Sequence, residues 1–252
     1  MIHLRDYQTE LVANTKAALK VHGKVVMQLA TGGGKTACAS KMIMGCVDAG
    51  WTVWFLCHRD ELVRQTSKTL VRMNIDHGFV AAGYPKDARK KVLVCMVGSV
   101  GRRLETLSAP NIIFVDEGHH AVAGTWAKIV EAFPKALVVG MTATPERLDG
   151  RGLDGVYNAL IPGPQLRWLM DEGWLCDFRL WTHAAPDLSK VKKRGDDYDP
   201  EALGAAMQSR AIVGDAVSHY LEICPSERAV SFCVNVEHSL ITRDAFRAAG
   251  VS

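Results

Sequence analysis

A glycine-rich loop that ends in lysine and threonine is the feature of the sequence with the clearest chemistry. Residues 30–36 read Ala-Thr-Gly-Gly-Gly-Lys-Thr and follow a short apolar run. Glycines let backbone N–H groups approach phosphate oxygens, while Lys35 can reach terminal phosphates and Thr36 can place its hydroxyl on Mg²⁺. A strict phosphate-loop pattern has glycine where this sequence has Leu29, so a glycine-rich turn with a solvated lysine is the alternative. The residues predicted to bind a nucleotide are Thr31, Gly32, Gly33, Gly34, Lys35 and Thr36.

Two acids, Asp116 and Glu117, form a second candidate group directly after the apolar run 112–115. Ligands of parallel sheets bind beyond the carboxyl ends of the strands, so these acids would arrive beside the glycine-rich loop. Asp116 can hold Mg²⁺ through water, and Glu117 can orient and deprotonate an attacking water. An acidic pair by itself is more often a solvated helix N-terminus. Together with the loop, the pair predicts hydrolysis of a nucleoside triphosphate.

A third group, Thr142-Ala143-Thr144, follows the apolar run 136–141. Small hydroxyl side chains at a strand end often satisfy only the backbone of a turn. In this sequence they can instead reach the acidic pair, because both would lie at the same edge of the sheet.

The elements that must position these groups alternate along the chain. Short runs rich in Val, Ile, Leu, Phe and Met predict strands buried on both faces of a parallel sheet, at 25–29, 52–57, 92–97, 112–115 and 136–141. Helices are predicted between them at 35–49, 60–73 and 127–133. Strand and helix in alternation predict an α/β fold built from right-handed crossovers.

The regular alternation fades after residue 141. The sequence predicts a helix at 165–172, a strand at 178–181, a helix from 201 to about 222, a strand at 229–234 and a helix at 236–249. Between them, residues 186–200 are polar, charged and bounded by proline, which is typical of a linker or an exposed loop.

These residues, in this order, resemble superfamily 2 helicases. The loop 30–36 resembles motif I, residues 116–119 (Asp-Glu-Gly-His) motif II and residues 142–144 motif III, which implies that His119, Thr142 and Thr144 couple the motifs. The run 116–152 is most similar to the branch with restriction-system helicase subunits, phage helicases and repair helicases. The resemblance implies a RecA-like P-loop NTPase lobe with a parallel sheet at 1–182, a linker at 183–200 and a truncated second RecA-like lobe at 201–252.

Further segments extend this resemblance in both directions. Residues 4–8 look like the adenine-sensing Q motif, which implies adenine contacts by Arg5 and Gln8. Residues 55–66 and 97–100 look like motifs Ia and Ib, which implies phosphate contacts to nucleic acid by Arg59, Gly98 and Ser99. Residues 230–238 resemble motif IV, whereas motifs V and VI and the arginine finger are not found.

Composition places few limits on function. The net charge of +3 neither demands nor excludes a polyanionic partner, and seven singly spaced cysteines are typical of reduced core thiols rather than a metal cluster. The absence of a long apolar run predicts no membrane span and a cytoplasmic protein.

Three functions remain open at this point. The first is an ATP-dependent helicase or translocase that uses ATP and Mg²⁺ on nucleic acid, with DNA favoured, and that a partner chain or a longer natural product completes. The second is a module that binds ATP and nucleic acid but hydrolyses little. The third, a metabolic P-loop kinase, is disfavoured because no acceptor-substrate pocket is recognisable.

Overall fold

The computed structural model of the chain describes residues 3–85, 87–119, 124–145, 152–181, 189, 191–194, 197–207 and 210–251. Residues 146–151, which belong to the helicase-like run 116–152, lie outside the described residues. So do residues 183–188 of the predicted linker. The chain divides into two compact units, Met1–Phe178 and Arg179–Ser252. Each unit is compact by itself.

The first unit contains a seven-stranded sheet in which every described pairing is parallel, with the order β3-β4-β2-β5-β6-β1-β7. Its strands are β1 (Lys24–Gln28), β2 (Val53–Cys57), β3 (Gly78–Val80), β4 (Val92–Met96), β5 (Ile112–Asp116), β6 (Leu137–Thr142) and β7 (Ala159–Pro162). The five predicted strands are confirmed to within about one residue at each end. The α/β prediction is therefore confirmed.

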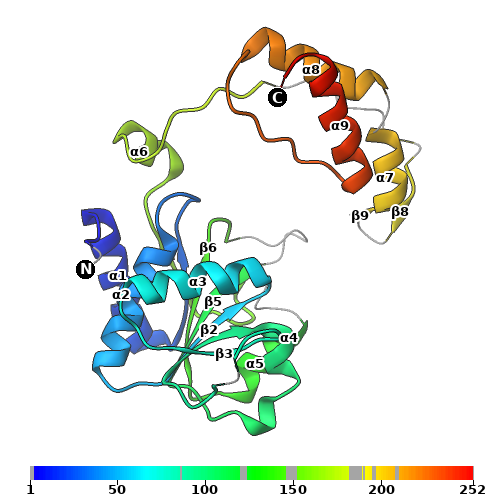
Figure 1. Ribbon diagram of the computed structural model, residues 1–252. Coiled ribbons are helices and arrows are strands. Elements are labelled where there is room, and N and C mark those ends of the chain that lie inside the picture. The colour runs from blue at the N-terminus through cyan, green and yellow to red at the C-terminus, as the bar shows by residue number, and fades with distance from the viewer. Residues whose placement is uncertain are drawn as a thin grey trace. The chain divides into compact units, whose positions relative to one another are not determined.

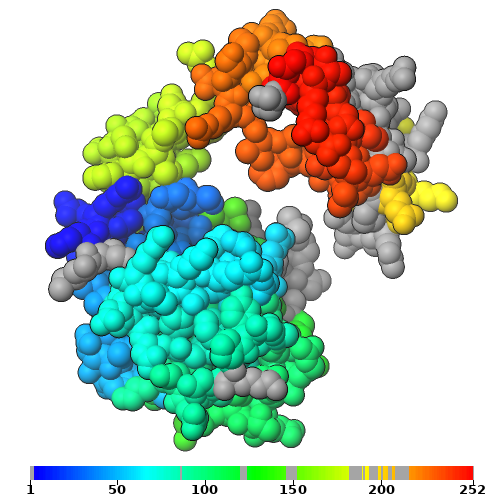
Figure 2. Space-filling model, viewed as in Figure 1, coloured from blue at the N-terminus to red at the C-terminus, as the bar shows by residue number. Residues whose placement is uncertain are grey.

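Helices cover both faces of this sheet (Figure 1). One face packs against α1 (Asp6–His22), α2 (Lys35–Asp48) and α3 (Asp60–Arg72), and the other against α4 (Val97–Gly101) and α5 (Gly124–Ala132). Side chains of β2 alternate between the two cores, with Phe55 in the first and Trp54 in the second, and all five of its residues are buried. The unit also contains the short 3₁₀ turn Leu104–Thr106 and α6 (Leu166–Asp171). In the space-filling view α3, in cyan, lies on the face turned to the viewer (Figure 2).

The second unit contains a short antiparallel pair, β8 (Lys193–Arg194) and β9 (Asp197–Tyr198), and the helices α7 (Pro200–Met207), α8 (Arg210–Ile223) and α9 (Val236–Ala248). The helix predicted from 201 to 222 is therefore described as two helices, and the hairpin lies within the predicted linker 183–200. The helix predicted at 236–249 is confirmed as α9.

Two strand predictions are wrong. Residues 178–181 and 229–234 have no strand assignment, although both are apolar enough for one. Leu180 is 78% exposed and Phe232 is 95% exposed, and no described strand of the second unit lies beside either segment. A strand needs a neighbour for its backbone hydrogen bonds, and apolar composition alone does not supply one.

No helix in the described part of the chain is long and apolar enough to cross a membrane.

Candidate functional site

The sheet brings the three predicted groups to one edge. β5, β6 and β1 are neighbours, and their registers pair Asp116 with Met141 and Gln28 with Thr142. The acidic pair, the threonine pair and the start of the glycine-rich loop therefore follow adjacent carboxyl ends of parallel strands, where ligands of such sheets bind.

The glycine-rich loop turns the chain from β1 into α2. Gly34 precedes the helix with φ 96°, a left-handed conformation that glycine adopts without strain. A Cβ at Gly33 would lie 2.8 Å from Cγ of Leu29, whose side chain is fully buried beneath the loop. Lys35 Nζ donates to the Leu29 carbonyl at 3.3 Å. Leu29, which departs from the strict pattern, thus supports the loop with its side chain and holds the lysine with its backbone.

Helix α1 is tied to this loop by two side chains. Tyr7 Oη and Gln8 Nε2 each donate to the Gly33 carbonyl at 2.8 Å, and Gln8 Nε2 also donates to Tyr7 Oη at 3.3 Å. Gln8 Oε1 accepts from the backbone N–H of Arg5 at 3.0 Å. Both N–H groups of the Gln8 amide are engaged within the chain, so Gln8 anchors the loop in this structure. Tyr7 was not singled out from the sequence, although it adjoins Gln8 in the motif-like segment.

Arg5 packs over the ring of Trp174 beside the same loop. Its guanidinium carbon is 4.4 Å from the ring centroid of Trp174, and the Trp174 side chain is half-exposed. Leu175, the next residue, would lie 2.7 Å from a Cβ at Gly32. The segment after α6 therefore forms one wall of the loop, which sequence patterns did not indicate.

The acidic pair occupies a strained turn. Glu117 has φ 52°, which is rare for a residue with a side chain, and its N–H donates to Asp116 Oδ1 at 3.2 Å. Burial raises the pKa of Asp116, the charge of Glu117 raises it further, and the Lys35 ammonium opposes both. Asp116, Glu117 and Lys35 are thus close enough to influence one another electrostatically.

A hydrogen-bond network joins the acidic segment to the threonine pair. The Thr142 hydroxyl donates to the Thr144 carbonyl at 2.9 Å and accepts from the Thr144 N–H at 3.1 Å. His119 Nδ1 lies 3.0 Å from the same hydroxyl and 3.5 Å from Glu117 Oε2. With its proton directed to the carbonyl, this hydroxyl can accept a hydrogen bond from His119 in the tautomer that carries the proton on Nδ1. The three residues predicted to couple the motifs therefore lie together.

Tyr157 contacts the backbone of the acidic segment through a hydrogen bond. It is buried, and its hydroxyl donates to the Gly118 carbonyl at 3.1 Å. A Cβ at Gly140 would collide with this hydroxyl, and one at Gly118 would lie 3.1 Å from it. Burial raises the pKa of Tyr157, so the phenol stays protonated and remains a donor. No sequence signal identified it, because the contact depends on two glycines that are distant along the chain.

The predicted nucleic-acid residues lie at the ends of two other strands. Arg59 follows β2 and Gly98 follows β4, and the two strands are neighbours paired through Cys57 and Met96. Both Arg59 and Gly98 are exposed. Ser99 is only 4% exposed, so its hydroxyl does not share that exposed face.

Known proteins resemble this chain over most of its length. Residues 1–147 match the family described as type III restriction enzyme, res subunit. A 51.5 kDa protein of a Lactococcus phage is 30% identical over 226 residues, covering 90% of this chain and 47% of the phage protein. The putative ATP-dependent helicase IRC3 of Saccharomyces cerevisiae is 29% identical over 242 residues, covering 86% of this chain and 34% of that protein. The chain thus spans less than half the length of both relatives.

Solved structures share the fold. A nuclease-deletion mutant of the Type ISP restriction-modification enzyme LlaGI, in complex with a DNA substrate mimic, superposes with a TM-score of 0.56 at 15% identity, covering 96% of this chain and 26% of the enzyme. This likeness supports the RecA-like fold predicted from the motifs. With a family match over residues 1–147, more than half of its 252 residues, the chain belongs to the helicase family described as the res subunit of type III restriction enzymes.

Proposed function

We propose that the chain binds ATP with Mg²⁺ and hydrolyses it, as the motor part of a helicase or translocase that acts on DNA. The main support for this proposal is that the glycine-rich loop between β1 and α2 lies close to the acidic pair at the end of β5, which is separated from β1 only by β6. Lys35 of the loop is near enough to lower the pKa of Asp116. Membership of a helicase family supports the same function at the level of the family.

The residues at this edge fit the phosphates of a nucleotide. Glycine at positions 33 and 34 permits this tight loop, because a Cβ at either position would meet Leu29 or Gln8, and the Gly33 N–H donates to the Ala30 carbonyl at 3.0 Å within it. The start of α2 adds the positive end of a 14-residue helix dipole. Lys35 would exchange the Leu29 carbonyl for phosphate oxygens, which are the stronger acceptors because they are charged.

The same edge supplies suitable ligands for Mg²⁺. The Asp116 carboxylate and the Thr36 hydroxyl are hard oxygen donors of the kind that this ion prefers, and Thr36 is exposed at the start of α2. When bound, Mg²⁺ would neutralise part of the phosphate charge.

Glu117 is the proposed general base. It would take a proton from water as the water oxygen bonds to the γ-phosphorus, while the bond between that phosphorus and the leaving ADP oxygen breaks. His119 Nδ1, at 3.5 Å from Glu117 Oε2, would hold the carboxylate toward Thr142. Arg5 and Gln8 are proposed to contact the adenine, with Trp174 as a further wall beside Arg5. Gln8 would exchange its 3.3 Å hydrogen bond to Tyr7 Oη for the base and keep its bond to the Gly33 carbonyl.

Nucleic acid is proposed to contact the exposed residues that follow β2 and β4. Arg59 and Gly98 lie there, and LlaGI, which shares the fold, was solved with a DNA substrate mimic. Residues 1–182 are proposed as the first lobe, 183–200 as a linker and 201–252 as part of a second lobe.

A second candidate function is a module that binds ATP and DNA but hydrolyses slowly by itself. The described residues of the second unit form no parallel sheet, and Val230 and Phe232 are exposed there. An arginine finger is worth roughly a thousandfold or more in phosphoryl-transfer rate, and motifs V and VI were not found in the sequence. A partner chain or a longer product would supply them.

Steady-state ATPase of the purified chain, with and without duplex and single-stranded DNA, tests the proposal. Glu117→Gln should keep ATP affinity and lower turnover about a hundredfold or more, because the amide has the size of the carboxylate but is no base. Glu131→Gln, an exposed acid on α5, is the matched control and should behave as wild type. Equal turnover by Glu117→Gln and wild type would contradict the assignment. If wild type and both variants bind ATP but hydrolyse it only at the background rate, the result would favour the second candidate function.

A further inference from the structure

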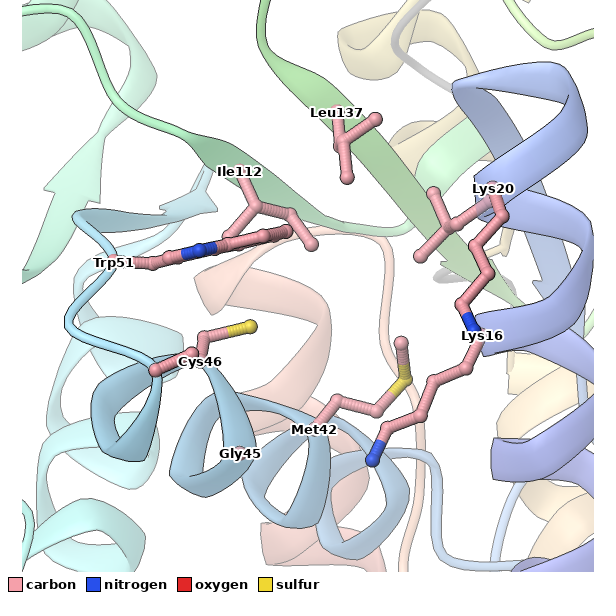
Figure 3. A pocket seen from close by; sticks show the side chains of 10 residues that line it. Lys16, Lys20, Met42, Gly45, Cys46, Trp51, Ile112 and Leu137 are labelled. Carbon is pink, nitrogen blue, oxygen red and sulfur yellow. The ribbon is translucent and has the colours of Figure 1, made fainter.

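A pocket of about 320 Å³ opens at the edge of the sheet opposite the glycine-rich loop (Figure 3). Ile112 and Leu137, the first residues of β5 and β6, form its floor, whereas the candidate nucleotide site lies at the ends of the same strands. Trp51 forms one wall. A volume of this size accommodates a small organic molecule. The pocket is separate from the proposed ATP site.

The remaining walls are apolar and come mainly from two helices. Leu19 of α1 and Met42 of α2 are buried, and the sulfur atoms of Met42 and Cys46 point into the space (Figure 3). Burial raises the pKa of the Cys46 thiol, so the thiol is uncharged at neutral pH. These walls therefore select an uncharged, apolar ligand body.

Gly45 leaves the pocket open, although glycine at this position lowers the stability of helix α2. Gly45 lies in the interior of α2, where glycine is less favourable than alanine by about 1 kcal/mol. A Cβ there would meet only Lys16 Nζ, at 3.6 Å, so close packing does not require the glycine. A larger side chain at this position would project into the pocket.

Two lysines give the rim a positive charge. Lys16 and Lys20 are four residues apart on α1 and line the same pocket, and Lys16 extends across it toward Gly45 of α2 (Figure 3). Within the described part of the chain, neither forms an ion pair with a carboxylate. The position of Lys20 in the last turn of α1 is favourable for the helix, but Lys16 lies before that turn. An apolar space edged by two such cations complements an anion with an apolar body.

We propose that this pocket binds a small amphipathic anion, whose aromatic or branched apolar body lies between α1 and α2 and whose carboxylate, sulfonate or phosphate lies between Lys16 and Lys20. The proposal does not depend on the ATP site, because no residue of the pocket belongs to that site.

A pair of probes separates the apolar and the ionic parts of this proposal. 8-Anilino-1-naphthalenesulfonate and N-phenyl-1-naphthylamine share their rings, but only the first carries an anionic group. Binding is followed through the NMR signal of the Trp51 indole N–H, assigned with Trp51→Phe, because other exposed apolar segments also attract such probes. Wild type should bind the sulfonate more tightly than the neutral amine.

Substitutions then locate the site. Lys16→Gln/Lys20→Gln should weaken sulfonate binding about fivefold, as expected for two exposed cations, and leave the neutral amine nearly unchanged. Lys68→Gln/Lys128→Gln removes the same charge from exposed positions on α3 and α5 and should change neither. Gly45→Leu should abolish binding of both probes at Trp51 by filling the space.

Three results would overturn the proposal. The first is equal affinity of wild type for both probes. The second is an equal loss of sulfonate binding in both lysine pairs, which would indicate a general charge effect. The third is an unchanged Trp51 response in folded Gly45→Leu.

Discussion

The backbone of Glu117 is the most informative single feature at the scale of residues. A glutamate with φ 52° costs free energy and persists only where its surroundings hold it. Two hydrogen bonds hold it here. The Glu117 N–H donates to the Asp116 carboxylate, and the Tyr157 hydroxyl donates to the carbonyl of the next residue, Gly118. The strained turn directs the proposed base, and we propose that Tyr157 positions this base through its hydrogen bond to the turn.

Tyr157→Phe tests that role. The change leaves the Gly118 carbonyl unsatisfied, which should lower the free energy of unfolding by about 1–3 kcal/mol. Turnover should fall while the KM for ATP stays nearly constant, because the phosphate loop is untouched. Tyr220→Phe is the matched control, since it removes a phenol that donates to the Glu227 carbonyl at 2.8 Å in the second unit. Equal kcat in the two variants would show that Tyr157 has only a structural role.

Asp116 gives a prediction about pH. Its raised pKa means that the folded chain holds this proton more tightly than the unfolded chain, so this stabilisation is complete at acid pH and lost as pH rises through the raised pKa. Asp116→Asn cannot ionise and keeps the oxygen that accepts from the Glu117 N–H. It should therefore unfold at higher urea than wild type at pH 7 without nucleotide, with a difference that shrinks as pH falls toward about 4. A difference independent of pH, or a less stable variant, would contradict this explanation.

At the scale of elements, α1 is the part of the fold that fixes the phosphate loop. Two donors from this helix, Tyr7 and Gln8, share the Gly33 carbonyl. Either one can satisfy it, so the loss of both is expected to cost more than the sum of the single losses.

A double-mutant cycle measures this coupling. Tyr7→Phe and Gln8→Ala should each destabilise the chain in urea, and the double variant should lose about 1 kcal/mol beyond their sum. Hydrogen exchange of residues 30–36 should rise most in the double variant. Strict additivity would show that the two side chains do not hold the loop together.

The elements also show which parts of the fold the sequence could predict. Buried strands such as β2 and β5 are continuous apolar runs, and each was predicted. β3 has only three residues, and β7 alternates partly buried with exposed residues, so neither gives such a run. The error at 229–234 has the opposite cause, since its composition suits a strand but no described neighbour pairs with it.

For the molecule as a whole, motif order predicted the candidate site better than composition did. Lys35, Asp116 and Thr142 are far apart in sequence, and the parallel order β5-β6-β1 brings their strand ends together. Tyr7, Tyr157 and Trp174 escaped prediction because their roles depend on tertiary contacts to backbone carbonyls or to Arg5. The pocket between α1 and α2 could not be predicted either, because its residues come from five separate elements or loops.

Equilibrium binding of ATP to the purified chain is the decisive test of whether this edge of the sheet is a site for ATP with Mg²⁺. Wild type should bind ATP with an affinity that rises with Mg²⁺. Lys35→Ala should remain folded and bind about ten- to a hundredfold more weakly, because it loses charge-assisted bonds to phosphate. Lys41→Ala, from the same helix α2, is the control and should bind as wild type. Undiminished affinity in folded Lys35→Ala, or no ATP binding by wild type, would show that this edge of the sheet is not the proposed ATP site.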